Sequence, residues 1–213
     1  MLVGADDHAS AVRRAVLAPA PAADCGWATW QGLTPALPDL AAGTAGRSFV
    51  GDAGFVGLMP AGGGLLQWWF DVPWCRSAPR PPSPVTWLRR RFAHYAAPVP
   101  DLLAAVSDAD IALYPHVRHA VPTRWGTGPS TLVGDAAHAF PPTLAQGASQ
   151  TLEDAWLLTR ALRTAAHPVP ALRRYERARS ARVRPVSRLA ATELTTGRRT
   201  HSPGCWPAAC PPR

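Results

Sequence analysis

The sequence predicts an α/β (α+β) chain in which a mixed sheet, largely antiparallel, is combined with several helices. Strand-like runs separated by glycine-containing turns fill the first third of the chain, and segments with helical spacing dominate the last third. Of the 213 residues, 47% are hydrophobic and only 17% are charged. This composition supports a sizeable core and disfavours a disordered chain.

The first half of the chain begins with a short strand from Met1 towards a turn at Asp6, followed by a helix over 10–17. Glycine-containing segments at 51–54 and 61–64 suit hairpin turns. Strands are expected on either side of these turns and before them, at 27–32, 47–52, 55–60 and 64–72. We therefore expect an antiparallel meander over about residues 27–72.

Aromatic side chains gather in the last strand of this meander, at Trp68, Trp69 and Phe70, with Trp74 just beyond it. They could line a substrate pocket on the sheet, or they could belong to the core. Because successive strand residues point to opposite faces, about half of them are expected in the core.

In the second half, a proline-rich linker at 77–84 precedes the first of several helices. Helices are expected at 84–95, 98–107, 151–165 and 170–191, and strands at 111–118 and 130–133. One side of the 151–165 helix carries the residues expected to be buried, namely Leu152, Ala155, Leu158, Thr159 and Leu162. From about Thr195 the sequence loses periodicity, and a disordered tail is expected over 195–213.

The net charge of +8 suggests a nucleic-acid partner, but its distribution does not. All 22 basic residues are arginines, and most are dispersed along the chain. A nucleic-acid-binding protein is expected to carry a basic patch or a recognisable module. A nucleic-acid-binding module is therefore a distant third hypothesis, and we expect a small molecule as the partner.

The four cysteines, at 25, 75, 205 and 210, show no zinc-like pairing, and no secretory signal precedes them. Reduced thiols in a cytoplasmic protein are therefore expected, without a metal site. No apolar run approaches the ~20 residues that span a bilayer, so no membrane association is expected.

The most organised segment runs from Thr131 to Trp156, where a buried strand enters a tight turn at Gly134 and Asp135. An ionised aspartate accepts hydrogen bonds only, which suits a sugar-type hydroxyl. Further on, 146–149 precedes a helix whose first amides favour an anionic or electron-rich group. The alternative is an ordinary strand–loop–helix connection in which Ser149 or Thr151 caps the helix.

The residues of this segment resemble the second flavin-binding motif of the class A flavoprotein monooxygenases, the family of para-hydroxybenzoate hydroxylase, salicylate hydroxylase and zeaxanthin epoxidase. The matching positions are Gly134–His138, Pro142, Gln146–Gly147 and Glu153–Ala155. The resemblance implies that Asp135, after Gly134, binds the ribityl chain of FAD. It implies that Pro142, Gln146 and Gly147 lie beside the isoalloxazine ring, with the helix N-terminus at Gly147 and Ala148 facing its pyrimidine end. Glu153 and Asp154 are expected to cap and orient the helix, and His138 to be structural.

The N-terminus is similar to the family's Asp-Gly-x-x-Ser-x-x-Arg motif, which is implicated in binding FAD and NAD(P)H. Asp6, Ser10 and Arg13 match this motif, so the resemblance implies that Asp6 and Arg13 contact the cofactors. Three positions depart from the family pattern: Asp7 and Ala145 stand where glycines are common, and Gln31 replaces the arginine of a Trp-Arg-Gly motif. The aspartate at position 7 weakens the inference of nicotinamide binding.

The resemblance implies a partial FAD-binding domain of the para-hydroxybenzoate hydroxylase type together with an antiparallel or mixed-sheet substrate domain. The expected division is a piece of the FAD-binding domain at 1–24, the substrate domain at 25–122 and the C-terminal part of the FAD-binding domain at 123–194. The Gly-x-Gly-x-x-Gly fingerprint of a dinucleotide fold is missing, so an N-terminally truncated form is expected.

The implied reaction is the NAD(P)H- and O2-dependent hydroxylation or epoxidation of a small aromatic or unsaturated substrate. The sequence names no catalytic side chain, because the flavin carries the oxygen chemistry in this family. The alternative is a non-catalytic remnant, or a fragment that needs a separately encoded N-terminal half.

Overall fold

The computed structural model describes residues 1–18 and 21–192, and the chain divides into two compact units. Residues 1–18, 21–25 and 116–192 form the described part of the first unit, and Gly26–Pro115 form that of the second. The residues between 116 and 122, expected in the substrate domain, therefore group with the first unit. The tail expected over 195–213 lies outside the described residues.

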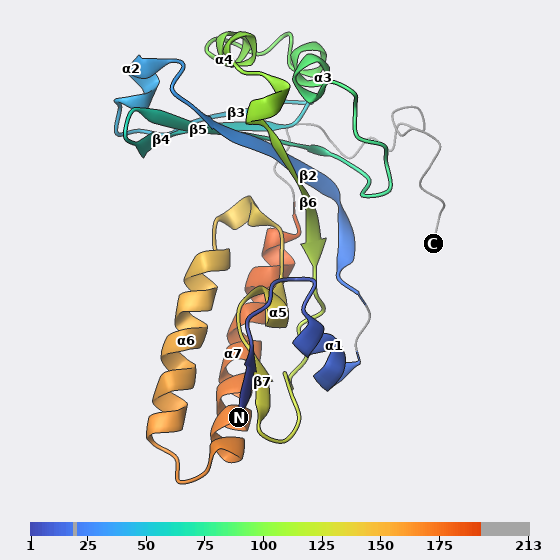
Figure 1. Ribbon diagram of the computed structural model, residues 1–213, viewed down its shortest axis with the longest axis vertical. Helices are drawn as coiled ribbons and strands as arrows, with labels where there is room; N and C mark the ends of the chain where they lie inside the picture. Colours follow the sequence, from blue (N-terminus) through green and yellow to red (C-terminus); the bar gives the residue numbers. More distant parts are fainter. Residues whose placement is uncertain (19–20, 193–213) are drawn as a thin grey trace. The chain divides into compact units, whose positions relative to one another are not determined.

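The second unit is built on a five-stranded sheet with the order β3-β4-β5-β2-β6 (Figure 1). Its strands are β2 (Ala23–Thr34), β3 (Arg47–Val50), β4 (Phe55–Gly62), β5 (Leu65–Pro73) and β6 (Ala112–Arg118). The β3–β4 and β4–β5 pairs are antiparallel, as the turns at 51–54 and 61–64 predict.

The expected simple meander is wrong at its first strand. Strand β2 pairs antiparallel with β5, for example Trp30 with Phe70, and not with its sequence neighbour β3. The connection from β2 to β3 contains a short helix, α2 (Pro38–Ala41), and is too long for a hairpin. It carries the chain to the edge of the sheet and leaves β2 between β5 and β6, with the Trp30 side chain fully buried.

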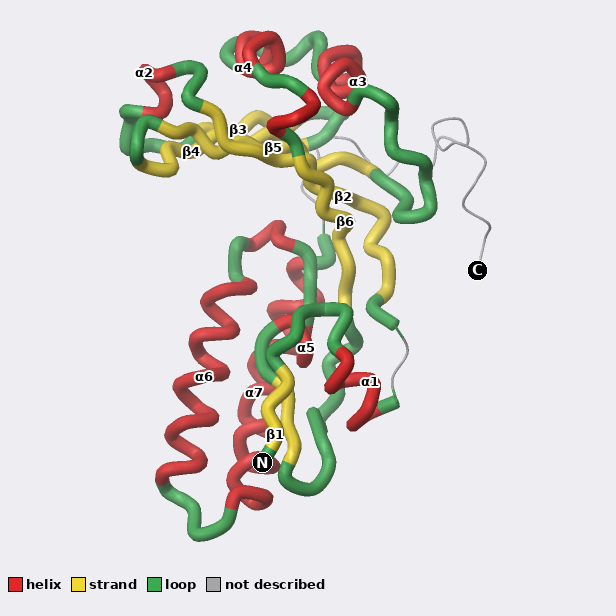
Figure 2. The backbone as a smooth tube through the Cα atoms, viewed as in Figure 1, coloured by secondary structure: helices red, strands yellow, loops and turns green. Residues whose placement is uncertain are grey.

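Helices α3 (Pro84–Arg91) and α4 (Val99–Ala105) cover one face of this sheet (Figures 1 and 2). Trp68 and Phe70 point towards them into the core, where the ring of Phe70 meets that of Phe92 edge-on at 4.9 Å. Trp69 lies on the opposite face and stacks on Phe55, with ring centroids 6.3 Å apart. The alternation expected for the aromatic strand is confirmed.

The first unit contains a parallel pair of short strands, β1 (Leu2–Gly4) and β7 (Ser130–Leu132), and two long helices, α6 (Gly147–Arg163) and α7 (Pro168–Ala190). Figure 2 shows α6 and α7 side by side. Shorter helical segments complete the unit, namely α1 (Ala11–Leu17), α5 (Asp135–His138) and a 3-10 turn at Pro142–Leu144. Its core packs Trp125, Leu132, Leu172 and Tyr175 together.

The buried face of α6 differs from the expected one. Leu152, expected to be buried, is 72% exposed, whereas the polar side chains of Gln150 and Asp154 are buried together with Leu158 and Ala161. The apolar spacing was a poor guide because hydrogen bonds and ion pairs, described below, satisfy the polar groups on the inner face. No helix within 1–18 or 21–192 is both long and apolar enough to cross a membrane.

We predict that Phe92→Ala lowers the free energy of unfolding by about 3–5 kcal/mol, because it leaves a cavity between the sheet and α3. Chemical denaturation followed by tryptophan fluorescence measures this change. Met59→Ala, at a half-exposed position of β4, serves as the control and is expected to change little. Equal losses in the two variants would contradict the placement of Phe92 in the core.

Candidate functional site

The turn after β7 has a backbone that only glycine adopts easily. Gly134 has φ 59° and ψ −142°, and a Cβ at this position would lie 3.0 Å from the Thr151 hydroxyl oxygen. The short helix α5 starts at the next residue, which is Asp135. Gly134 therefore determines where the segment after β7 turns and how the Asp135 side chain is positioned.

A pocket of about 350 Å³ opens beside this turn. The described residues that line it are Ala5, Asp7, Val133, Gly134, Asp135, Gly147, Ala148 and Thr151. They come from the end of β1, the turn after β7 and the first turn of α6, so the packing of these three segments creates the pocket.

Asp135 presents a carboxylate to the pocket that is free to bind a ligand. Its side chain is exposed and accepts no hydrogen bond from any residue in the described part of the chain. The surrounding protein raises the pKa of Asp135 by desolvation, and the nearby Asp7 carboxylate raises it further, against an opposing contribution from His138. A hydrogen-bond donor from a ligand would stabilise its ionised form.

The N-terminus of α6 supplies donors to the same pocket. This helix of 17 residues begins at Gly147, and the preceding Gln146 makes no side-chain capping bond. The first amides of a helix have no partner within the helix and carry partial positive charge. A Cβ added at Gly147 would meet no atom within 4 Å, so a ligand can approach the backbone there.

Four of the eight predicted cofactor-binding residues line this pocket, and they are Gly134, Asp135, Gly147 and Ala148. An aspartate acceptor and helix amides are suited to hydroxyl groups and to an electron-rich ring edge, so these residues fit the ribityl and ring portions of a flavin. Pro142 starts the 3-10 turn and Gln146 precedes α6, and neither lines the pocket.

Asp6 and Arg13 also lie outside the pocket lining and have other partners. The Asp6 carboxylate accepts hydrogen bonds from the Ser10 hydroxyl at 2.5 Å and from the Ala11 amide at 2.7 Å, so it caps helix α1. The Ser10 bond is the main reason why the pKa of Asp6 is lowered. Arg13 is buried and donates to the carbonyl oxygens of Ala136 and Ala137 at 3.0 and 2.8 Å, which ties α1 to α5.

A buried ionic network centred on Asp154 stabilises the turn at Gly134. Its carboxylate accepts hydrogen bonds from the Gly134 amide at 2.7 Å, from His138 Nε2 at 2.7 Å and from Arg179 Nε at 2.6 Å. Burial alone would raise the pKa of Asp154, but these bonds outweigh it and keep the pKa below the ordinary value. The carboxylate therefore stays ionised and links the turn and α5 to α6 and α7.

Arg179 extends this network towards the surface. It is fully buried and also bonds Glu153 at 2.6 Å and Gln150 at 2.9 Å. Glu153 in turn pairs with Arg182, and mainly for that reason its pKa falls to about 2. Glu153 and Asp154 were expected to cap and orient α6; the capping is wrong, because both lie within the helix and bond to other segments. The sequence gave no hint of Arg179, which lies 25 residues after Asp154 in an arginine-rich helix.

Two positions that depart from the family's glycines have left-handed backbones. Asp7, in the pocket wall, has φ 64°, and Ala145, just before α6, has φ 52°. Aspartate tolerates this region better than alanine does, because its short polar side chain can hydrogen-bond locally. Here the Asp7 side chain accepts a bond from the His8 amide at 2.6 Å. Both positions therefore have a backbone conformation that favours glycine.

Comparison with known proteins identifies the family of the chain. A family model described as an FAD binding domain matches residues 1–190. The chain belongs to this family. The match confirms the resemblance drawn from the Gly134 and Asp6 segments, and it covers both structural units.

Related proteins in this family include the FAD-dependent urate hydroxylase of Klebsiella pneumoniae, 34% identical over 86% of this chain and 48% of that protein. Another is the 3-amino-4-hydroxybenzoate 2-monooxygenase PtmB3 of Streptomyces platensis, 38% identical over 88% and 48%. The chain spans about half the length of the curated relatives that it matches.

Solved structures confirm the fold class. The crystal structure of Klebsiella pneumoniae HpxO complexed with FAD and uric acid is similar with a TM-score of 0.83 at 33% identity, over 90% of this chain and 50% of that one. A salicylate hydroxylase substrate complex gives a TM-score of 0.70 at 25% identity, over 89% and 53%.

We predict that Asp154→Asn lowers the free energy of unfolding by about 3 kcal/mol, because it leaves the buried Arg179 without its full counter-charge. The lowered pKa means that this contribution is complete above pH 3.8, the ordinary value for Asp, and is lost as the pH falls through the native pKa. Urea denaturation should therefore give the same difference from wild type at about pH 7 and about pH 5, and a smaller one below pH 3.8.

The control for this prediction is Asp39→Asn, which changes an exposed carboxylate in the other unit. It is expected to shift stability by less than about 0.5 kcal/mol. An Asp154→Asn variant as stable as this control would show that the network does not hold the turn.

We also predict that Ala145→Gly raises the free energy of unfolding by about 1 kcal/mol, because glycine removes the clash of a Cβ in the left-handed region. Thermal or urea denaturation measures the gain. The matched change Ala155→Gly, at an exposed position within α6, is expected to lower stability by about 1 kcal/mol. A loss at both positions would contradict the strained backbone at Ala145.

Proposed function

We propose that this chain binds FAD and serves an NAD(P)H- and O2-dependent monooxygenase that hydroxylates or epoxidises a small aromatic or unsaturated substrate. The observation that carries the proposal is the pocket in which the unpaired Asp135 carboxylate meets the first amides of α6. Membership of the FAD-binding domain family and the similarity to an FAD-bound hydroxylase structure support it.

When bound, FAD supplies the redox chemistry of oxygen transfer, and the residues of the chain bind and orient it. Asp135 would accept hydrogen bonds from the hydroxyl groups of the ribityl chain. The amides at Gly147 and Ala148 would donate to the electron-rich end of the ring system. Asp154 fixes the Gly134 amide and thereby the direction in which Asp135 leaves the turn.

The use of NAD(P)H is supported by the N-terminal motif alone. Asp6, Ser10 and Arg13 match the residue types of the family motif, but their side chains already have partners within the chain. The Ser10 hydroxyl donates to Asp6 and accepts from the Arg13 amide, and the Arg13 side chain donates to α5. Their contribution to nicotinamide binding would therefore be to hold the loop around Asp7 in place.

We predict that Asp135→Ala weakens FAD binding at least about tenfold, since a hydrogen bond to a charged group contributes ~1.5–3 kcal/mol. Titration of the purified chain with FAD, followed by quenching of flavin fluorescence, measures the dissociation constant. Because the pKa of Asp135 is raised, affinity should fall as the pH is lowered towards that pKa. Asp135→Asn should remove this pH dependence.

Asp101→Ala, at an exposed position of α4 in the other unit, is the matched control and should leave FAD affinity unchanged. A wild-type chain that binds no FAD would overturn the proposed function. Equal affinity for FAD in the wild type and in Asp135→Ala would be consistent with FAD binding but would show that Asp135 does not contribute to it.

A further inference from the structure

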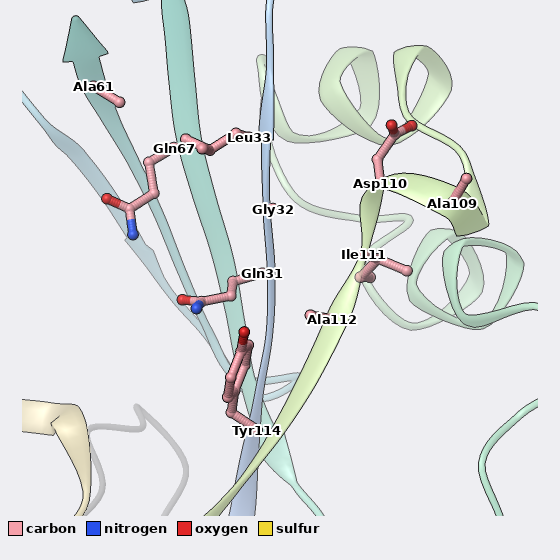
Figure 3. A pocket seen from close by; sticks show the side chains of 10 residues that line it. All are labelled: Gln31, Gly32, Leu33, Ala61, Gln67, Ala109, Asp110, Ile111, Ala112 and Tyr114. Carbon is pink, nitrogen blue, oxygen red and sulfur yellow. The ribbon is translucent and has the colours of Figure 1, made fainter.

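A second pocket lies within the sheet unit, across β5, β2 and β6, with a volume of about 550 Å³ (Figure 3). The described residues that line it are Gln31, Gly32, Leu33, Ala61, Gln67, Ala109, Asp110, Ile111, Ala112 and Tyr114. One of them is Gly32, where a Cβ would lie 2.1 Å from the backbone oxygen of Asp110. The glycine therefore lets β2 approach the segment that leads into β6.

Three polar side chains of this pocket have unused hydrogen-bonding groups. The amides of Gln31 and Gln67 and the hydroxyl of Tyr114 make no hydrogen bond with any residue of the described ranges. Figure 3 shows all three on the same side of β2, with the Tyr114 hydroxyl directed towards the Gln31 side chain. Together they offer both donors and acceptors without carrying a charge.

The only ionisable groups among the ten lining residues are Asp110 and Tyr114. Asp110 accepts bonds from the Ser107 hydroxyl at 2.7 Å and the Ser107 amide at 2.8 Å, and these bonds lower its pKa. It is therefore an anion at neutral pH. No lysine, arginine or histidine stands among these ten described residues to offset an anionic ligand.

Gln31, in the segment Trp30-Gln31-Gly32, places a neutral amide at the pocket wall. A carboxylate bound to these amides would lose hydration and meet no cation among the ten described lining residues, and Asp110, across β2, adds negative charge. A carboxamide, lactam or phenol could instead bond to the free amides and the hydroxyl.

We propose that this pocket binds the substrate and selects an uncharged ring compound that carries amide- or phenol-type groups, with Gln31 as a specificity-determining residue. This inference rests on the proposed function for the role of the ligand as substrate. The binding preference itself depends only on the pocket and can be measured without flavin.

Salicylamide and salicylate are suitable probes, because they share the phenol ring and differ in a carboxamide against a carboxylate. Saturation-transfer NMR titrations of the flavin-free chain at neutral pH give a dissociation constant for each. We expect salicylamide to bind about tenfold more tightly than salicylate. A site that forms hydrogen bonds with a carboxamide discriminates against an analogue that lacks the matching donor.

Gln31→Arg introduces a cation and should tighten salicylate binding about tenfold, which removes the preference for salicylamide. Val50→Arg adds the same charge to the half-exposed face of β3, outside the pocket, and serves as the matched control. It should keep the wild-type preference. Circular dichroism of both variants checks that they fold.

The inference is overturned if the wild type binds salicylate as tightly as salicylamide, if it binds neither probe, or if both arginine variants shift the preference equally. The FAD titration on the same preparation separates this result from the proposed function. FAD binding without a salicylamide preference would contradict only the substrate class, whereas a preference without FAD binding would contradict only the proposed function.

Discussion

The first unit depends on one buried carboxylate. Asp154 holds the amide of Gly134, the imidazole of His138 and the guanidinium of Arg179 at 2.6–2.7 Å. These partners belong to the turn after β7, to α5 and to α7, so one side chain of α6 determines how four segments meet. A buried charge without partners would be strongly unfavourable. The Asp154 carboxylate therefore requires all three partners, and this requirement disfavours other arrangements of the four segments.

The pocket in front of this network is built from constrained backbone. Gly134 and Asp7, which line it, and Ala145, which precedes α6, have positive φ angles, and only Gly134 is a glycine. Strained positions persist where the surrounding structure determines them, and they gather at binding sites. Here the Asp154 network and the bonds between Arg13 and α5 hold this backbone in place. The exposed Asp135 carboxylate therefore belongs to a rigid wall, which suits an orienting role.

Most of the longer helices and strands and half of the pocket lining could be predicted from the sequence, because glycine turns, alternation and helical spacing are local. The position of β2 could not, since its pairing with β5 joins residues about 40 apart in the chain. The inner face of α6 was also missed. Apolar spacing favours Leu152, whereas the buried positions there belong to Gln150 and Asp154, which are satisfied by Arg179 from another helix.

The positive charge of the chain has a structural explanation that bears on its ligands. Several arginines are used within the fold: Arg13 and Arg89 donate to backbone carbonyl oxygens, and Arg173 and Arg179 pair with carboxylates. Neither the pocket at Asp135 nor the pocket at Gln31 has an arginine among its described lining residues, and each contains an aspartate. A net charge of +8 would suggest anionic ligands, yet no cationic side chain is among the described lining residues of either pocket. The local charge around a pocket, and not the total for the chain, thus determines what it can bind.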